Sequence, residues 1–207
     1  MARDEHPRDA RRDHRRQARR AQLLDDAVSA IRELGPAATM EQLARRGGVT
    51  KPILYRHFGD RSGLIAAIAE RYTDQLFESV AGALAAGAED PRGRISHTID
   101  AYLRFIEADP EVYRFLERQA ASAGVHRDAT VATNLARQVA LVMGEELRAA
   151  DLDSGSAVPW AFGIIGMVRY AGDWWLEDGT MTRERLVDYL TALVWSGLQS
   201  AAQTSAT

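Results

Sequence analysis

The chain has 207 residues, a formal net charge of −3 and no cysteine. The lack of cysteine excludes disulfide bonds and thiolate metal sites, and no apolar run approaches the roughly 20 residues that a membrane-spanning helix needs. The arginine-rich start is not followed by the apolar segment of a secretory signal. We therefore expect a cytoplasmic protein with no membrane association.

The distribution of charge and the residue composition indicate what kind of protein this is. Residues 1–61 carry 14 Lys and Arg against 9 Asp and Glu, a net +5, whereas residues 62–207 have a net charge of −8. A basic first part joined to an acidic body favours local contact with phosphate groups. Hydrophobic residues make up 46% of the chain, and much of this is Ala and Leu, which favours helix over sheet.

The first predicted elements are a polar arm and a helix. Residues 1–14 are polar, mixed in charge and without apolar periodicity, so we expect a disordered basic arm. From about residue 15 an apolar stripe predicts a helix, and Gly35-Pro36 ends it.

Two short helices are predicted next. Thr39 is followed three residues later by Gln42, the spacing of a capping box, and Gly47-Gly48 ends the helix that this box begins. Thr50 predicts the N-cap of a second short helix, which has Pro52 in its first turn and ends at Gly59.

Longer helices account for the rest. Asp60 predicts the cap of a helix over about 61–86, and Asp90-Pro91 and Asp109-Pro110 each pair an N-cap with a proline in the first turn. The further expected ranges are about 91–108, 110–123, 127–151, Ser156 to Gly179 and Thr182 to about 202, with a frayed tail. The sequence thus predicts an all-α fold of about nine helices.

The short helices have the geometry of a helix-turn-helix. The first offers an apolar inner face, the second buries Leu54 and Phe58, and the outward residues of the second are Thr50, Lys51, Pro52, Ile53, Tyr55 and Arg56. Lys51 can donate to a guanine or a phosphate, and Pro52 and Ile53 can touch a thymine methyl group. Tyr55 and His57 can hydrogen-bond to phosphates. Taken singly, each residue could equally be core or ordinary surface.

The stretch from Thr39, TMEQLARRGGVTKPILYRHFGDRSGLI, resembles the DNA-binding region of the TetR family of bacterial repressors. The resemblance rests on the Gly48-Val49 turn, the Leu54-Tyr55-x-His57-Phe58 cluster and the basic residue three places after Phe58. It implies that bases are faced by Thr50, Lys51, Pro52 and Ile53, and that phosphates are held by Thr39, Tyr55, His57 and Arg61. Arg61 replaces the family's usual lysine, and Glu41 stands where some relatives place a basic contact.

The resemblance also implies a domain order and partners. We expect a helix-turn-helix domain over residues 15–60 and an effector-binding and dimerisation domain over 61–203, with a homodimer through the last two helices. A monomer whose last helices close the core is the alternative. Candidate pocket residues are aromatic, Met and Leu side chains at helical spacing, which could also be core: Tyr102, Phe105, Tyr113, Leu116, Trp160, Met167, Tyr170 and Trp174.

The predicted function is a repressor that a small, hydrophobic effector releases from a double-stranded DNA operator. An activator of the same fold is the first alternative. An all-α enzyme is a weaker one, because the sequence holds no P-loop, no Gly-x-Gly-x-x-Gly, no His-Glu-x-x-His and no cysteine nucleophile. We expect no catalytic residues, cofactor or metal.

Overall fold

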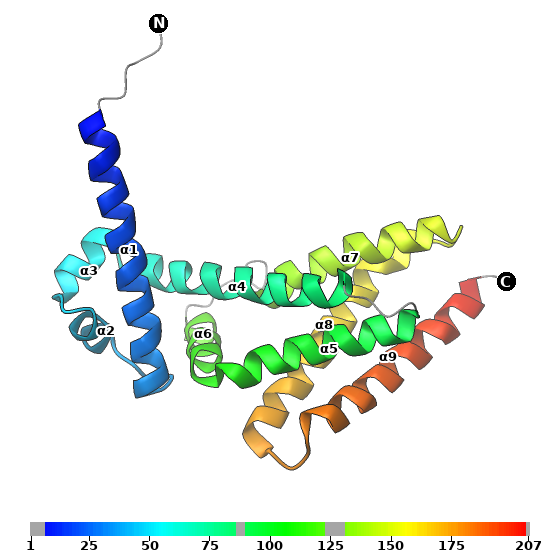
Figure 1. Cartoon of the computed structure of the whole chain (residues 1–207). Coiled ribbons are helices and arrows are strands. Elements are labelled where there is room, and N and C mark those ends of the chain that lie inside the picture. Colours follow the sequence, from blue (N-terminus) through cyan, green and yellow to red (C-terminus); the bar gives the residue numbers. More distant parts are fainter. Residues whose placement is uncertain (1–6, 86–89, 123–130, 206–207) are drawn as a thin grey trace, which may run out of the picture. The chain divides into compact units, whose positions relative to one another are not determined.

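A computed structural model describes residues 7–85, 90–122 and 131–205. Every regular element in those ranges is helical, which confirms the all-α prediction (Figure 1). The helices described are α1 (Pro7–Leu34), α2 (Met40–Arg46), α3 (Lys51–Phe58), α4 (Arg61–Ala85), α5 (Pro91–Ala108), α6 (Pro110–Ser122), α7 (Val131–Ala149), the 3-10 turn η2 (Ser154–Ser156), α8 (Ala157–Asp178) and α9 (Arg183–Ser205).

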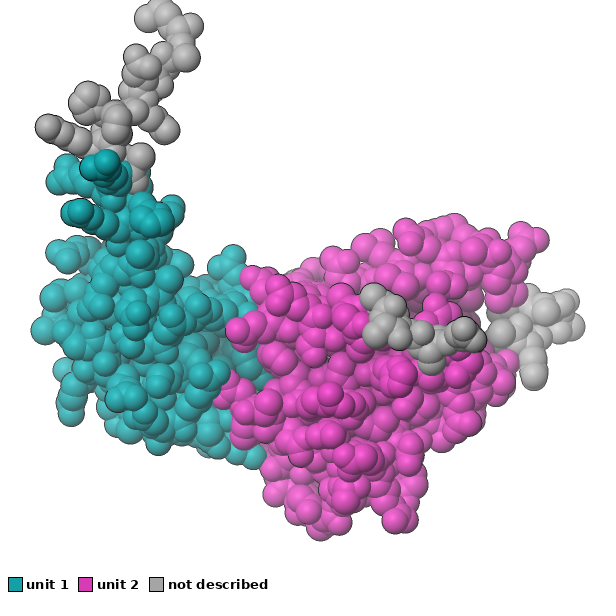
Figure 2. Space-filling model, viewed as in Figure 1, with its two compact units in different colours: residues 1–72, 111–122 teal, residues 73–110, 123–207 magenta. Residues whose placement is uncertain are grey.

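The chain divides into two compact units (Figure 2). Unit 1 comprises residues 1–72 and 111–122, and unit 2 comprises residues 73–110 and 123–207. This grouping differs from the expected boundary at residue 60, because it divides α4 after Tyr72 and assigns α6 to unit 1. Four apolar side chains of α6 are buried: Val112, Tyr113, Phe115 and Leu116.

The expected disordered arm over residues 1–14 is wrong for its second half. The α1 helix begins at Pro7, so residues 7–14 are helical, and the first six residues lie outside the described ranges. Proline suits the first helical turn, and no glycine or further proline interrupts the chain before Gly35. Arg, Ala and Gln are good helix formers, so interleaved charges mark a solvated helix here and not disorder.

The two short helices form as predicted. The Thr39 hydroxyl accepts from the Gln42 backbone N–H at 3.4 Å, and the Gln42 side chain accepts from the Thr39 backbone N–H at 2.8 Å, which confirms the capping box. Gly48 has a φ of +64°, a backbone conformation that residues other than glycine rarely adopt. At Gly47, a Cβ atom would lie 2.9 Å from the Leu23 side chain of α1, so glycine lets α1 pack closely against the turn.

The predicted caps of the longer helices are also present. Asp60 accepts from the Gly63 N–H at 2.8 Å and Asp90 accepts from the Gly93 N–H at 3.0 Å. Gly179, with φ +61°, ends α8. Helix α9 begins after Thr182 as expected but continues to Ser205, beyond the expected end near residue 202.

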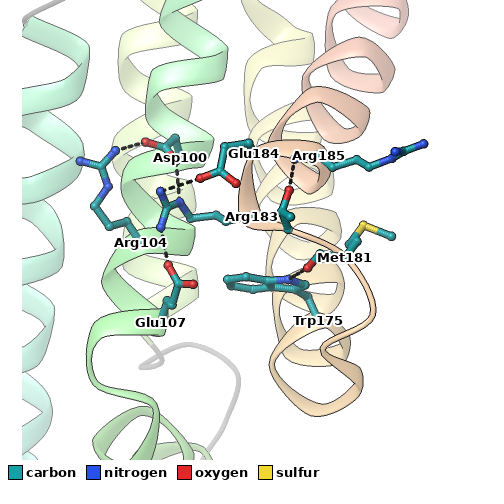
Figure 3. A network of polar contacts seen from close by, with 9 residues as sticks. Asp100, Arg104, Glu107, Trp175, Met181, Arg183, Glu184 and Arg185 are labelled. Carbon is teal, nitrogen blue, oxygen red and sulfur yellow. Dashed lines mark hydrogen bonds and ion pairs between the residues drawn. The ribbon is translucent and has the colours of Figure 1, made fainter.

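Unit 2 is a bundle in which α7 packs along α8 and α5 contacts both α9 and α8. A cluster of polar contacts around Arg183, the first residue of α9, ties α9 to α5 (Figure 3). Arg183 donates to Asp100 at 2.9 Å and also pairs with Glu107, and these hydrogen bonds raise its pKa above the ordinary value. Nearby, the Trp175 indole donates to the Met181 carbonyl at 2.8 Å and so fixes the α8–α9 turn.

Candidate nucleic-acid interface and ligand cavity

The N-terminal edge of α3 faces away from the unit 1 core. Leu54 and Phe58 are buried, as predicted, because they pack inward with the apolar faces of α1 and α2. The residues expected to face outward divide into two groups, with Thr50, Lys51, Pro52 and Arg56 exposed and Ile53, Tyr55 and His57 half-buried. The helix therefore presents one polar edge while its opposite face holds it in place.

Thr50 occupies the N-cap position of α3, but its side chain makes no capping hydrogen bond. Its hydroxyl therefore differs from that of Thr39, which is engaged in the capping box. The Lys51 ammonium lies 5.7 Å from the centre of the Tyr55 ring, a cation–π distance that holds the lysine along the exposed edge.

Four of the expected phosphate- and base-contacting residues line one polar hollow of about 310 Å³ in unit 1. They are Thr39, Lys51, Tyr55 and Arg61. Glu41 also lines the hollow and contributes a negative charge to it. Gln119 of α6 completes the rim, and its side-chain oxygen accepts a hydrogen bond from Arg61 at 2.6 Å. Gln119 was not among the site residues predicted from the sequence, because no sequence pattern connects it with Arg61 on α4.

Positive charge surrounds His57 at the end of α3. Partial burial lowers the pKa of His57 below its ordinary value of 6.5, and the neighbouring charge of Arg56 lowers it further. Three arginines of α1 act in the same direction: Arg19, Arg16 and Arg20. His57 is therefore predominantly neutral at pH 7, and the end of α3 and the middle of α1 form one positively charged region.

Unit 2 contains an apolar cavity of about 260 Å³ lined by α5, α7, α8 and α9, with Val80 of α4 in its wall. The lining is mostly aliphatic: Ile95, Ile99, Leu135, Val139, Met143, Ile164, Ile165, Val168, Val194 and Leu198 are among its residues. Its charged members are Arg94 and Glu146, and Thr98, Tyr102 and Trp195 each bring one polar atom.

Three polar members of the lining contact one another. Arg94 lies 3.5 Å from Glu146 across the α5–α7 gap, and the Thr98 hydroxyl donates to the Arg94 carbonyl at 2.8 Å. The Glu146 side chain is 62% exposed and that of Arg94 is 39% exposed, so this pair marks the side of the cavity that meets solvent. A bound molecule would meet hydrocarbon over most of its surface and one neutralised ion pair at one end.

The structure places one of the expected pocket residues, Tyr102, in this wall. Tyr113 and Leu116 are buried in unit 1, while Phe105, Trp160 and Met167 are half-buried outside the lining. Tyr170 and Trp174 are exposed, the former by 77%. The signal that could have found the lining is the stripe Ile95, Thr98, Ile99 and Tyr102 on α5, which repeats at the helical spacing i, i+3, i+4, i+7.

Comparison with known proteins decides which family this arrangement represents. Residues 23–68 match the family described as "Bacterial regulatory proteins, tetR family", and residues 79–207 match the "Tetracyclin repressor-like, C-terminal domain". The chain belongs to the TetR family of transcriptional regulators. Members of this family bind DNA operators and are typically dimeric.

Individual TetR-family relatives cover most of the chain. An uncharacterised HTH-type transcriptional regulator of Mycobacterium tuberculosis is 34% identical over 87% of this chain and 77% of its own length. The HTH-type transcriptional activator FasR of Mycolicibacterium smegmatis is 30% identical over 91% of this chain and 87% of its own. A TetR-like regulator of Rhodococcus sp. RHA1 shares the fold with a TM-score of 0.63 and 22% identity, over 87% of this chain and 96% of that one.

Helices α8 and α9 both expose large apolar side chains, which we call the exposed stripe. They are of interest because members of the TetR family are typically dimeric. Val158, Phe162, Tyr170 and Trp174 are exposed at multiples of four residues along α8, and Tyr189 and Leu193 are exposed on α9. Other apolar residues of the same two helices pack inside the subunit: Ala161, Val168, Trp175, Leu186, Leu190 and Val194. Both faces of α8 are apolar, which is why the sequence alone did not separate them.

The described residues were also compared with the requirements of a membrane-spanning helix and of a metal site. Among the described residues, no helix combines the length and apolar character needed to cross a membrane. Within the same ranges, no group of three or more His, Cys, Asp or Glu side chains is arranged to hold a metal ion.

Proposed function

We propose that this protein is a homodimeric repressor that a small apolar effector releases from its DNA operator. The observation that carries the proposal is the exposed polar edge of α3 held over a buried apolar face. Such an edge fits the major groove of B-DNA, which is wide enough to admit a helix.

In this proposal the first residues of α3 read bases. Thr50 brings a hydroxyl that is not used in capping, Lys51 brings a flexible ammonium, and Pro52 brings an exposed apolar surface for a thymine methyl group. Ile53 lies half-buried behind them as a second apolar contact, and exposed Arg56 lies one turn further along α3.

The polar hollow beside α3 supplies the phosphate contacts. Tyr55 and Arg61 line it, so a phenol and a guanidinium converge on one place, and Thr39 lies beside them with its hydroxyl engaged by Gln42. His57 lies at the end of α3 and, when neutral, donates one ring N–H to a phosphate oxygen. These contacts fix the position of α3 on the duplex and do not themselves select bases.

The cavity in unit 2 supports the effector part of the proposal. It favours an uncharged, mainly hydrocarbon molecule, because the lining is aliphatic and the Arg94–Glu146 pair already balances its own charge. Helix α4 connects this cavity with the DNA-binding region, since it begins at Arg61 and carries Val80 in the cavity wall. A ligand that displaces Val80 would therefore act on a helix whose first residue contacts phosphate.

The exposed stripe on α8 and α9 supports a homodimer. Its aromatic and aliphatic side chains would be buried by a second copy, and hydrophobic burial drives association. Gly163, Gly166 and Gly197 lie on these helices with open space around them, which lets a partner helix approach closely. A dimer presents two copies of α3 to two half-sites.

A second candidate function is an activator, favoured by the similarity to FasR, which is named a transcriptional activator. The two candidates share the same DNA contacts and differ in the position of the operator relative to the promoter. A reporter gene behind the natural promoter separates them, because a repressor lowers its output and an activator raises it.

The DNA-reading part of the proposal is tested with the full-length protein and a duplex selected from a random library. Lys51→Ala should cost about 1–3 kcal/mol of binding free energy if Lys51 pairs with a guanine, and it should relax preference at one base pair. The matched control is Arg45→Ala, an exposed cation on α2. Normal operator binding by the double variant K51A/Y55A would contradict the proposal that α3 contacts the bases.

The effector part is tested by filling the cavity. Ile99→Trp should abolish binding of the apolar dye Nile red while leaving operator affinity unchanged, because Ile99 lies in the cavity wall in unit 2. Leu141→Trp, at an exposed position of α7 that does not line the cavity, is the matched control. Unchanged dye binding by the Ile99 variant would remove the cavity from the proposal. A neutral compound that displaces the dye should also release the operator.

A further inference from the structure

The N-terminal half of α1 carries a concentration of arginine that the helix-turn-helix does not require. Residues 11–20 contain six arginines and one aspartate, a net charge of +5. All ten residues are exposed and helical. A well-formed helix holds these charges at fixed positions, which a disordered arm would not do.

The six arginines occupy one side of α1. At 100° per residue, Arg12, Arg16 and Arg20 form one row of i+4 neighbours, and Arg11, Arg15 and Arg19 form the adjacent row. The two rows together span about half of the helix circumference. The other half carries His14, Gln17, Ala18 and Ala21.

We call the surface defined by Arg11, Arg12, Arg15, Arg16, Arg19 and Arg20 the arginine face, and its end nearest the helix-turn-helix contacts that motif. The last two members of the face make these contacts. Arg19 donates to the Gly47 carbonyl in the turn at 3.2 Å, and the Arg20 guanidinium lies 4.8 Å from the centre of the Phe58 ring on α3. The remaining four arginines continue the same face beyond the contacts with α2 and α3.

The field of this face reaches α3. Burial and the charge of Arg56 lower the pKa of His57 most, and Arg19, Arg16 and Arg20 of α1 lower it further. Positive charges on α1 and at the end of α3 therefore lie close enough together to act on the same side chain. Proximity to a DNA-reading helix makes a polyanion the partner that complements this face.

We propose that the arginine face of α1 is a second DNA-binding element, which holds the phosphates of duplex DNA flanking the half-site read by α3. The inference rests on the proposed operator binding. Arg11 to Arg20 span about 13 Å of helix, which equals about four base-pair steps of B-DNA. Guanidinium groups bind phosphate oxygens in a bidentate manner, so arginine suits this task.

The experiment compares two duplexes with the full-length protein. The short duplex contains only the selected operator core, and the long duplex adds about eight base pairs on each side, a length chosen from the phosphate spacing. The wild type should bind the long duplex at least about tenfold more tightly at 0.15 M salt, because several further phosphates are neutralised. Equal affinity for the two duplexes would overturn the inference.

The variant R11Q/R12Q/R15Q/R16Q tests which residues cause the difference. It should bind both duplexes with the affinity that the wild type shows for the short one. Its salt dependence on the long duplex should decrease by about 0.9 for each phosphate that the variant no longer neutralises. The matched control, R92Q/R137Q/R148Q/R185Q, removes the same charge from unit 2 and should keep the preference for the long duplex. If the α1 variant lost the same affinity for both duplexes, the arginine face would not bind the DNA that flanks the operator core.

A footprint of the wild type keeps the inference testable if the variant folds poorly. Hydroxyl-radical cleavage should be reduced on both strands outside the selected core, next to each half-site. Protection confined to the core would overturn the inference while leaving the proposed function intact. If the wild type bound neither duplex, the proposed function itself would fail.

Discussion

Arg61 at the first position of α4 donates a hydrogen bond of 2.6 Å to the side-chain oxygen of Gln119 on α6. Both residues belong to unit 1 and both line the polar hollow beside α3. The guanidinium has five N–H donors, so the bond to Gln119 orients Arg61 and leaves other donors for a phosphate. Gln119 is neutral and does not cancel the charge of Arg61.

This relationship predicts an ordered series of operator affinities. Gln119→Ala should weaken binding modestly, by about 0.5–1 kcal/mol, because Arg61 loses one net hydrogen bond that orients it. Gln119→Glu should weaken binding more than Gln119→Ala does, because a carboxylate neutralises the guanidinium and repels phosphate. Arg61→Ala should weaken binding to all sequences alike and reduce the salt dependence by about one phosphate contact.

Fluorescence anisotropy with the selected operator measures the series across a range of salt concentrations. Gln138→Glu on α7 is the matched control for the added charge, because Gln138 is exposed in unit 2. Equal affinities for the Gln119→Ala and Gln119→Glu variants would show that Gln119 does not act through Arg61.

His57 predicts a pH dependence. Burial and the surrounding arginines lower its pKa below 6.5 in the free protein, and a phosphate placed against it favours the charged form. DNA binding therefore takes up a proton, so operator affinity should rise as the pH falls from 7 towards 5.5. Folding stability changes in the opposite direction, because the unfolded chain binds the proton more readily below pH 6.5.

The measurement is operator affinity against pH for the wild type and for His57→Gln, which keeps a hydrogen-bond donor without titrating. The variant should lose the part of the pH dependence that His57 contributes. Removing the positive charges of Arg16, Arg19 and Arg20 should raise the pKa of His57, which histidine NMR signals report directly. An identical pH profile for the two proteins would exclude His57 from the phosphate contacts.

Helix ends were predictable because they depend on local chemistry. The Thr39–Gln42 box, the Asp60 and Asp90 caps and the left-handed glycine at Gly179 each involve residues within four positions of one another. Helical content at residues 7–14 was missed because mixed charge resembles disorder in composition, although it is compatible with a solvated helix.

The ligand cavity was harder to predict because it depends on which side of each helix faces inward. On α8, Val168 lines the cavity and Tyr170, two residues later, is exposed, yet both are hydrophobic. A helix that is apolar on all sides gives no periodic signal of direction. The Arg61–Gln119 contact joins residues 58 positions apart, and sequence spacing alone cannot reveal it.

The exposed stripe on α8 and α9 predicts the effect of a charge at the proposed dimer interface. Tyr170→Arg combined with Leu193→Arg should give a monomer in sedimentation velocity at micromolar concentration, because two unpaired charges per subunit would be buried. Operator affinity should fall with it, since two half-sites no longer bind together. Leu141→Arg, an exposed leucine on α7, should remain dimeric. A dimeric double variant would place the interface elsewhere.

The close packing around Gly172 of α8 predicts that a larger residue at this position destabilises the core of unit 2. A Cβ atom there would lie 2.9 Å from Cδ1 of Ile106 and 3.2 Å from Cδ2 of Leu103 on α5. Both side chains are fully buried, so neither can move aside without disturbing its neighbours. Gly172→Ala should therefore lower the free energy of unfolding by about 1–3 kcal/mol.

Urea denaturation at one fixed protein concentration measures this effect, because the stability of an oligomer depends on concentration. Gly82→Ala is the matched control: Gly82 lies within α4, and a Cβ atom there would meet open space. It should raise stability by up to about 1 kcal/mol, since alanine favours helix over glycine. The two substitutions add the same methyl group to a helix, so a difference in sign isolates the close approach of α8 to α5. If Gly172→Ala also raised stability, α5 and α8 could separate enough to accept a side chain.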